Sequence, residues 1–351
     1  EPVRLSQLKE RFYDPGLLAK QLGLSKEPLR VVAGFRDVKL YPEVVLAQEN
    51  GKLDVHLRNR GGGIGRVQVF VNGKELVADA RGPGVEPQQP EATLTLDLAA
   101  APRLSAGTTE VRVVVWTADG HLSSRGAVAL VHHAPAPVVE PELYAIVVGV
   151  SRYASPGLDL RFSAKDAEDF ATAVELGAMR LFGAKKVHLT LLSSGSDPRA
   201  RPPTREAVAE AFRKAGAARP EDVLLVYLAG HAISLPGPTG EYLYLTPEAR
   251  SADPAAFADA AVRARTTLSS EELTEWIKGI PALKQVMVLD TCAAGAAQAK
   301  LLEKRAVSGD QVRAIERLKD RTGFHVLMGS AADAVSYEAS RYGQGLLTFA
   351  L

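Results

Sequence analysis

A short apolar segment that leads into the chain's only cysteine constrains the fold most. Residues 285–289 are almost uninterrupted in their apolar character, which is typical of a strand buried on both faces in a parallel sheet. Asp290, Thr291 and Cys292 follow directly, and small residues come next. Because ligands of α/β proteins bind beyond the carboxyl ends of such strands, the sequence predicts a site at Cys292.

A second segment has the same design. Residues 222–228, DVLLVYL, are apolar and lead through Ala-Gly to His231. Side chains alternate along a strand, so we expect Asp290 and Cys292 to point the same way and Thr291 to point the opposite way. Two strand ends therefore offer an imidazole and a thiol, with a carboxylate beside the thiol.

The region from residue 143 to residue 351 alternates between strand and helix patterns. Strands are predicted at 144–150, 186–192 and 324–329, helices at 164–182, 204–217 and 269–278, and a hairpin through 241–245. Ser269 and Glu272 have the spacing of a capping box. This alternation predicts an α/β fold, a mostly parallel sheet with helices on both faces.

The region from residue 29 to residue 133 has a period of two instead. LDVHLR, RVQVFV, ATLTLDL and TEVRVVVWTAD alternate apolar and polar residues, and turn pairs such as Asn72-Gly73 separate them. This pattern predicts an all-β sandwich of immunoglobulin-like type, with RVQVFVNGKELV as a hairpin.

These patterns divide the chain into four parts. We expect a short amphipathic segment at 1–28, the sandwich at 29–133, a Pro-rich linker at 134–142 and the α/β domain at 143–351. The first residues lack the apolar core of a signal peptide, and the last residues, GLLTFAL, stop within an apolar segment. We therefore expect the natural protein to be longer, with the α/β domain truncated at its C-terminal end.

Composition excludes several classes of function. Hydrophobic residues make up 46% and charged residues 24%, which are ordinary globular values. The net charge is +1, from 42 basic and 41 acidic residues, so no overall field attracts nucleic acid or an anionic membrane. No apolar run approaches the length of a membrane helix. A single cysteine excludes a disulfide framework and suits a reducing compartment, so we expect a cytoplasmic protein.

Two patterns suggest ligand sites that we consider structural. The glycines of residues 61–65, GGGIG, precede a strand, whereas a phosphate-binding loop opens a helix. His132 and His133 have no Cys, Asp or His partner at ligand spacing, so a solvated linker pair is the better interpretation. The sequence therefore predicts no metal site.

The two strand ends resemble motifs of the caspase-like cysteine peptidases, specifically of the metacaspase and bacterial caspase-like branch. That branch has one strand ending in Ser-Gly-His-Gly and another ending in Asp-x-Cys-x-x-Gly, and this chain has LVYLAGHA and VLDTCAAG. The resemblance covers residues 143–351. The Gln-Ala-Cys-x-Gly motif of animal caspases fits less well, because Asp290 occupies the position of its glutamine. Segments similar to FYDPGLLAK follow a β-propeller in some bacterial relatives, which implies a further upstream domain.

The resemblance implies a role for each site residue. It makes His231 the general base and Cys292 the nucleophile, with the backbone N–H groups of Ala232 and Cys292 binding the oxyanion. It also places Asp166, within LRFSAKDAEDF, beside Asp290 in the S1 pocket. A carboxylate near the thiol raises the pKa of that thiol unless a cation faces it, and a substrate Arg or Lys supplies one. The resemblance thus implies an endopeptidase that cleaves protein substrates after exposed Arg or Lys residues, without a cofactor.

Simpler interpretations remain open for each of these residues. A lone cysteine is most often an inert buried residue, and a lone histidine most often a structural one. Asp166 also suits the first turn of a helix, where the dipole favours an acid, and Asp290 also suits a cap or loop.

The basic stretch at residues 298–321 suggests self-processing. Related peptidases cleave themselves in this interval, and we expect cleavage at Lys304 or Arg305, beside a break at Ser308-Gly309; a solvated, partly helical insertion is the alternative. Calcium activates many metacaspases, but Asp253 and Asp259 are too few for a site of six or more oxygens.

Departures from the family motifs leave two further functions open. Ala229 and Ala232 replace a serine and a glycine, and we expect strain at Ala232 if the oxyanion turn requires positive φ. Ala293 and Ala294 stand where polar residues are frequent, and no sequence feature identifies a third residue that orients the histidine. The chain is then either an inactive scaffold that binds partners through its sandwich or an enzyme that stays latent until an upstream activator binds.

Overall fold

The computed structural model divides into two units. Contacts group Glu1–Asp14 with Pro28–Val138 in the first unit and Pro15–Glu27 with Val139–Leu351 in the second. The segment predicted at 1–28 therefore contributes to both. The structure describes residues 2–25, 27–32, 34, 38–49, 51–97, 107–132, 139–235, 240–293, 308–329, 338–339 and 344–351.

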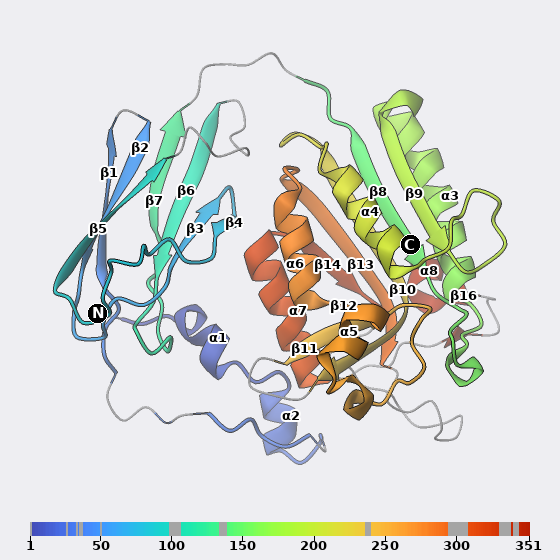
Figure 1. Cartoon of the computed structure of the whole chain (residues 1–351), viewed down its shortest axis with the longest axis horizontal. Coiled ribbons are helices and arrows are strands. Elements are labelled where there is room, and N and C mark those ends of the chain that lie inside the picture. The colour runs from blue at the N-terminus through green and yellow to red at the C-terminus, as the bar shows by residue number, and fades with distance from the viewer. Residues whose placement is uncertain are drawn as a thin grey trace. The chain divides into compact units, whose positions relative to one another are not determined.

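The first unit contains two antiparallel sheets (Figure 1). The three-stranded sheet has the order β1-β2-β5 and the four-stranded sheet the order β4-β3-β6-β7. The strand bounds are Glu43–Glu49 (β1), Lys52–Arg58 (β2), Val67–Val71 (β3), Lys74–Val77 (β4), Glu91–Asp97 (β5), Thr108–Val115 (β6) and Ala127–His132 (β7). The short helices η1 (Leu5–Leu8) and α1 (Lys9–Phe12) precede them.

Alternate residues of both sheets form one core. Val55 of β2 and Val113 of β6 belong to the same buried cluster. Along each of these two strands, the residues that alternate with the buried ones are more exposed. This is the predicted period of two, and it packs the sheets through their apolar faces. The predicted hairpin is confirmed, since β3 and β4 pair across a turn in which Asn72 and Gly73 both have positive φ, 48° and 81°.

The glycine-rich residues 61–65 have a structural explanation. A Cβ at Gly62 would lie 2.4 Å from the carbonyl oxygen of Leu40, and one at Gly65 would lie 2.1 Å from that of Thr117. Close approach of backbones therefore requires glycine here without any ligand. Of the predicted linker pair, His132 lies in β7 with its Nδ1 3.1 Å from the Thr108 hydroxyl, and His133 lies outside the described residues.

The second unit is built on a parallel sheet with the order β9-β8-β10-β13-β14. An antiparallel pair, β11 and β12, extends it beside the carboxyl half of β10. The strand bounds are Leu143–Gly149 (β8), Val187–Ser193 (β9), Val223–Leu235 (β10), Glu241–Leu245 (β11), Thr267–Ser269 (β12), Lys284–Ala293 (β13) and His325–Met328 (β14), with the short pair Glu338–Ala339 (β15) and Gln344–Gly345 (β16) near the chain end.

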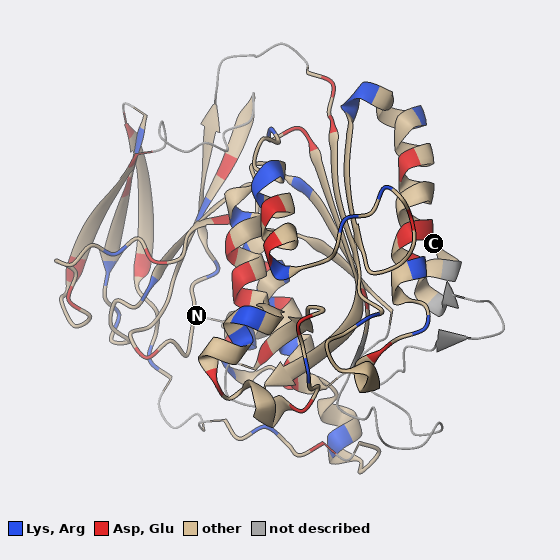
Figure 2. Cartoon of the chain, turned by 45° about the vertical axis from the view of Figure 1, so that its right-hand side comes forward, with Lys and Arg blue, Asp and Glu red and all other residues tan. Residues whose placement is uncertain are grey.

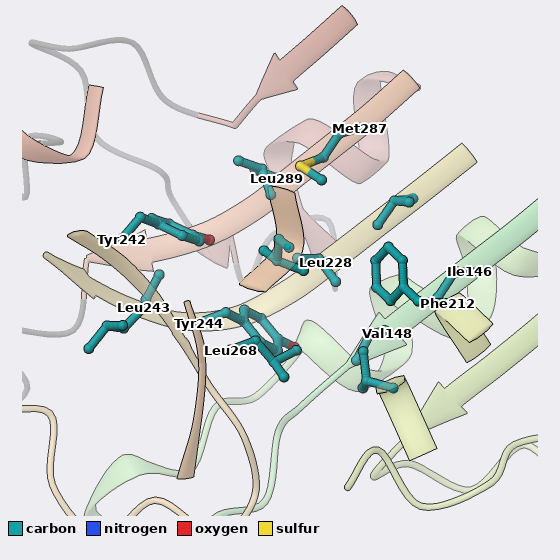
Figure 3. Close-up of a cluster of buried hydrophobic side chains, with 14 of the residues drawn as sticks. Ile146, Val148, Phe212, Leu228, Tyr242, Leu243, Tyr244, Leu268, Met287 and Leu289 are labelled. Carbon is teal, nitrogen blue, oxygen red and sulfur yellow. The ribbon is translucent and has the colours of Figure 1, made fainter. Parts of the chain in front are cut away.

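Helices cover both faces of this sheet, as predicted. The longer helices are α3 (Ser163–Phe182), α4 (Arg205–Ala215), α6 (Ser270–Gly279) and α7 (Gly309–Thr322); the shorter ones are α2 (Leu17–Gln21), α5 (Ala260–Thr266), α8 (Leu346–Ala350), η2 (Pro156–Leu158), η3 (Ala184–Lys186) and η4 (Pro254–Phe257). Helices α4, α6 and α7 share one buried cluster with the sheet, where Phe212 packs near Ile146 and Val148 (Figure 3). Helix α3 and Leu347 of α8 belong to a cluster on the opposite face.

Charge follows this layering in the second unit. Lysine, arginine, aspartate and glutamate lie mostly on helices and in loops, while the strands of the sheet are largely uncharged (Figure 2). The capping box predicted at α6 is confirmed, because Ser269 accepts the Glu272 N–H and Glu272 accepts the Ser269 N–H. Thr204 caps α4 by accepting the Ala207 N–H. Within the described residues, no helix combines the length and apolar character needed to cross a membrane.

Gly149 beside α3 and Gly177 within α3 provide a test of this packing. A Cβ at Gly149, at the end of β8, would lie 2.5 Å from the Cβ of Ala167 and 2.6 Å from the Ser163 carbonyl oxygen, whereas one at the exposed Gly177 meets nothing within 4 Å. We expect Gly149→Ala to lower the free energy of unfolding of the second unit by about 1–3 kcal/mol through overpacking. Gly177→Ala is the control and should raise it by about 0.5–1 kcal/mol. Urea denaturation followed by Trp276 fluorescence measures both, and equal midpoints would contradict the packing.

Candidate active site

The carboxyl ends of β10 and β13 bring the two predicted catalytic residues into register. The strands pair in parallel from Val223 opposite Lys284 to Ala232 opposite Ala293, and His231 is the partner of Cys292. The histidine and the cysteine are therefore direct neighbours across the strand pair. The structure describes the backbone of Cys292 and not its side chain, so the direction predicted for the thiol lies outside what it describes.

Both strands continue beyond the ends that the sequence predicts. Strand β10 runs to Leu235 because β11 pairs with it from Ala232 onward, after β8 has stopped pairing at Ala229. Strand β13 runs to Ala293, pairing with the extended β10. His231 and Cys292 therefore lie within the strands, whereas the apolar segments predict strand ends at residues 228 and 289.

Two tyrosine hydroxyls form hydrogen bonds with the backbone of β10 at the point where its pairing partner changes from β8 to β11. Tyr244 donates its hydroxyl to the Ala229 carbonyl at 2.8 Å, and the N–H of His231 donates to the hydroxyl of Tyr153 at 2.9 Å. A Cβ at Gly230 would lie 3.0 Å and 3.2 Å from these two hydroxyl oxygens, and φ there is 149°. Glycine before the histidine is thus required by the tyrosines that hold the backbone on either side of it.

The imidazole of His231 is buried and oriented by a main-chain group. Its Nε2 lies 2.8 Å from the carbonyl oxygen of Leu158, and its exposed fraction is 2%. A carbonyl only accepts, so Nε2 carries the hydrogen, and in the neutral ring Nδ1 is then the basic nitrogen. The ring of Tyr153 lies beside the imidazole, with centroids 5.2 Å apart. The orienting group that no sequence feature revealed is therefore a backbone carbonyl.

The predicted S1 acids both lie near Tyr227, and both are buried. Asp290 is 7% exposed and Asp166, in the first turn of α3, is 3% exposed. Oδ2 of Asp290 accepts the hydroxyls of Thr348 at 2.8 Å and Tyr227 at 3.2 Å. Burial raises the pKa of Tyr227, and the negative charges of Asp290 and Asp166 raise it further. Asp290 is therefore in contact with the phenol of Tyr227, and the role of both acids in S1 stays a prediction.

The oxygens of Asp290, Tyr227 and Thr348 form a closed triangle. The third contact joins the hydroxyls of Tyr227 and Thr348 at 2.7 Å. When Asp290 is ionised, the hydroxyls of Tyr227 and Thr348 supply two protons for the three contacts. When Asp290 is protonated, its own proton is the third, and each contact can be a hydrogen bond. Burial raises the pKa of Asp290, and the Thr348 and Tyr227 hydrogen bonds offset part of this rise. Thr291 points to the opposite face as predicted, with its hydroxyl 3.2 Å from that of Tyr242.

Ala232 does not carry the expected strain. Among the described residues Asn72 is the one non-glycine with positive φ, so Ala232 has ordinary strand geometry. It lies within β10, in register with Tyr244 on one side and Ala293 on the other. The replacement of glycine by alanine therefore costs no backbone strain, and the role of the Ala232 and Cys292 N–H groups as oxyanion donors stays a prediction.

The basic stretch after the cysteine divides at Ser308. Residues 294–307, with Lys304 and Arg305, lie outside the described residues. Ser308 and Gly309 are not a break, because Ser308 caps α7 by accepting the Gln311 N–H. Basic residues of α7 have structural partners: Arg313 pairs with Asp310, Arg317 donates to the Gly240 carbonyl, and Arg321 pairs with Glu271 and Glu275.

The two acids considered as calcium ligands cap the starts of helices. Asp253 accepts the Ala255 N–H at the start of η4, and Asp259 accepts the Ala261 N–H at the start of α5. Among the described residues no group of three or more His, Cys, Asp or Glu is arranged to hold a metal ion. The absence of a cofactor stays a prediction, with calcium as its alternative.

Comparisons with known proteins give a family, together with solved structures of low TM-score. A search of curated proteins finds no match. Among solved structures, the chain is similar to a putative polysaccharide deacetylase from Bacillus anthracis (10% identity, 82% of this chain and 80% of that chain, TM-score 0.19) and to a polysaccharide deacetylase from Bacillus cereus (9%, 82% and 80%, 0.18). A family 28 exopolygalacturonase from Yersinia enterocolitica has 14% identity over 56% of this chain and 29% of its own, with a TM-score of 0.15. At such TM-scores these likenesses carry no argument.

The family model described as caspase domain matches residues 142–351. This match includes β8 to α8, and with them both strands that carry the candidate site. Since it spans more than half of the chain, the protein belongs to the caspase-domain family of cysteine peptidases.

Proposed function

We propose that the protein is a cysteine endopeptidase in which Cys292 is the nucleophile and His231 the general base. The observation that carries this proposal is the register of β10 and β13, which makes the two residues direct partners across the strand pair. The hydrogen bond from Nε2 to the Leu158 carbonyl supports it, because it leaves Nδ1 as the nitrogen that takes up a proton.

The chemistry follows from these two groups. The imidazole takes the thiol proton, and the thiolate attacks the peptide carbonyl. The N–H groups of Ala232 and Cys292 are the proposed donors to the resulting oxyanion, and one such donor is worth about 3 kcal/mol. The imidazolium then gives its proton to the leaving amine, and water releases the acyl group from sulfur. The Leu158 carbonyl stabilises the imidazolium while it carries the extra proton.

For specificity, we propose that Asp166 and Asp290 select Arg or Lys in S1. The charges of both acids raise the pKa of Tyr227. On this proposal, a substrate cation bound between the two acids meets two carboxylates. A neutral Asp290 gains little from such a cation, whereas an ionised one gains an ion pair in a buried setting. Substrate binding on this proposal replaces the Thr348 and Tyr227 hydroxyls as partners of Asp290.

The second candidate is an inactive scaffold that binds protein partners through the first unit. The closed triangle around Asp290 favours it, because an acid that is already satisfied has less need of a substrate cation. Exposed apolar side chains on two strands of the first unit offer a contact surface: Val45 on β1, and Val128 and Leu130 on β7.

Replacement of the nucleophile separates the two candidates. We expect the wild-type chain to hydrolyse a fluorogenic Arg or Lys peptide and Cys292→Ala to reduce kcat by at least about 1,000-fold, because no other group forms the acyl intermediate. An Asp peptide is the matched substrate control and should be cleaved far more slowly. Equal rates of hydrolysis for wild type and Cys292→Ala would contradict the peptidase proposal and favour the inactive scaffold.

Replacement of Asp290 tests whether this buried acid lowers the stability of the folded protein while it provides specificity for Arg. Its pKa is raised in the folded protein, so the wild type loses stability as pH increases from about 4, the value in the unfolded chain. We expect Asp290→Asn to unfold at a higher temperature than wild type at pH 8, and this advantage to vanish at low pH. Hydrolysis of the Arg peptide should fall sharply in the same variant.

Asp54→Asn is the control for this substitution, because Asp54 also accepts a threonine hydroxyl, that of Thr95, but at an exposed position. Its melting temperature should stay close to that of wild type at both pH values. Full Arg hydrolysis by Asp290→Asn would refute the proposed role in S1.

We propose self-cleavage at Lys304 or Arg305. The basic residues of α7 are held by ion pairs and helix structure, which makes them poor cleavage sites. We expect N-terminal sequencing of fragments to begin at residue 305 or 306. The double variant Lys304→Ala, Arg305→Ala should stay intact, and Lys319→Ala should be cut like wild type. Fragments that form equally in the Cys292→Ala variant would contradict self-cleavage.

A further inference from the structure

The loop between β8 and α3, residues 150–162, contacts His231 twice. The carbonyl of Leu158 accepts from the imidazole at 2.8 Å, and the hydroxyl of Tyr153 accepts the His231 N–H at 2.9 Å. The ring of Tyr153 also lies against the imidazole. These two contacts come from residues five positions apart in one loop, so they hold the histidine only if that part of the loop has a fixed shape.

Asp159 links the two contacts to each other. It directly follows Leu158, and its Oδ1 accepts the backbone N–H of Tyr153 at 3.0 Å. This hydrogen bond closes a ring of chain from residue 153 to residue 159. The other carboxylate oxygen pairs with Arg152 at 3.0 Å. The Tyr153 N–H, and after it the Arg152 guanidinium, hold the pKa of Asp159 below its usual range.

The rest of the loop is fixed by main-chain bonds that do not involve this carboxylate. Leu160 donates its N–H to the Ser151 carbonyl at 2.9 Å, and the N–H of Ala154 donates to the Pro247 carbonyl at 2.7 Å. Ser151 accepts the Ala164 N–H through its hydroxyl, which fixes the start of α3. Within the span from Tyr153 to Asp159, the carbonyls of Ser155 and Pro156 also accept the N–H groups of Leu158 and Asp159. The Asp159 carboxylate adds the bond that joins this turn to the backbone of Tyr153.

We propose that Asp159 is a positioning residue for the catalytic histidine, closing the loop so that the Leu158 carbonyl and the Tyr153 hydroxyl meet His231 together. This inference rests on the proposed Cys292–His231 pair and names a residue beyond it. Asp159 touches neither the sulfur nor the substrate in this role. It acts through Leu158 and Tyr153, by setting the direction and the tautomer of the imidazole.

The acceptor oxygen of Asp159 matters more than its charge. The side chain of Arg152 is 77% exposed, and ion pairs at such positions contribute little. The hydrogen bond to the Tyr153 N–H, in contrast, fixes the loop backbone itself. Asparagine keeps an acceptor oxygen at this place without the charge, whereas alanine removes it and serine is too short to reach. The expected order of function is therefore wild type, then Asp159→Asn close behind, then Asp159→Ser and Asp159→Ala.

The chemical reactivity of Cys292 provides a readout that needs no proteolysis. It is the only cysteine in the chain, so iodoacetamide alkylation of the whole protein reports this thiol alone. An imidazolium beside the sulfur keeps thiolate present below the ordinary thiol pKa of about 8.5. If the imidazole loses its direction, alkylation at pH 6–7 should slow and its pH profile should shift toward that of a free thiol.

We expect Asp159→Ala and Asp159→Ser to lower both kcat/KM for the Arg peptide and the alkylation rate at neutral pH by about 10-fold or more. Asp159→Asn should stay within about 3-fold of wild type in both, because the acceptor remains. Rescue by asparagine identifies a geometric role. Melting curves of each variant establish that the fold is kept, and two acceptor-free variants keep the test valid if one of them does not fold.

Asp197 offers a matched control in another loop of the same unit. Its Oδ1 accepts the Arg199 N–H at 2.8 Å, and its carboxylate pairs with the Arg199 guanidinium, as Asp159 pairs with a backbone N–H and Arg152. Among the described residues, no hydrogen bond of Asp197 reaches His231. We therefore expect Asp197→Ala to leave the alkylation profile and kcat/KM within about 2-fold of wild type. A loss as large as that of Asp159→Ala would overturn the specific role of Asp159.

The two readouts distinguish failure of this inference from failure of the proposed peptidase. Alkylation profiles that are identical for wild type and Asp159→Ala would overturn the positioning role even if the protein is a peptidase. A profile that shifts in Asp159→Ala while wild type cleaves no peptide would support the positioning role and contradict a peptidase that is active without an activator. A wild-type profile equal to that of His231→Ala would overturn both, since the imidazole would then not act on the sulfur.

Discussion

The parallel pairing of β10 with β13 is the constraint on which the rest of the second unit depends. Apolar residues on both faces of each strand fix the register, since a slip of one residue would turn every buried side chain to the opposite face. The same register makes His231 the partner of Cys292. The packing that stabilises the sheet and the geometry that the chemistry needs are therefore one arrangement, set by apolar segments far from the reacting groups.

The sequence predicted this arrangement well where side chains carry the signal. Apolar segments located the inner strands, and Ser269 with Glu272 located the start of α6. The strand ends were wrong because the partner of β10 changes from β8 to β11, which no local pattern records. The basic stretch read as a possible insertion forms α7 in its second half, where polar residues cover one face and Ile315 and Leu318 pack into the core.

The missed parts of the candidate site are groups that carry no sequence signature. Every residue has a carbonyl, so only the path of the loop from β8 to α3 makes that of Leu158 special. Tyr153 is an ordinary aromatic residue until its hydroxyl meets the backbone of the histidine. Thr348 lies in the last helix and reaches Asp290 from a distant part of the chain. The motif alone predicts that Asp290 is available to bind substrate, whereas in the structure Asp290 accepts hydrogen bonds from Thr348 and Tyr227.

The start of α7 is held by a residue near the other end of the chain. The Gly309 N–H donates to the carboxylate of Glu27, which also pairs with Lys20, and β14, just beyond α7, adds a strand to β13. A break between Ala293 and Ser308 would leave both of these attachments in place. The two pieces would then stay together as one non-covalent particle, of unchanged hydrodynamic size, and would separate only in denaturant.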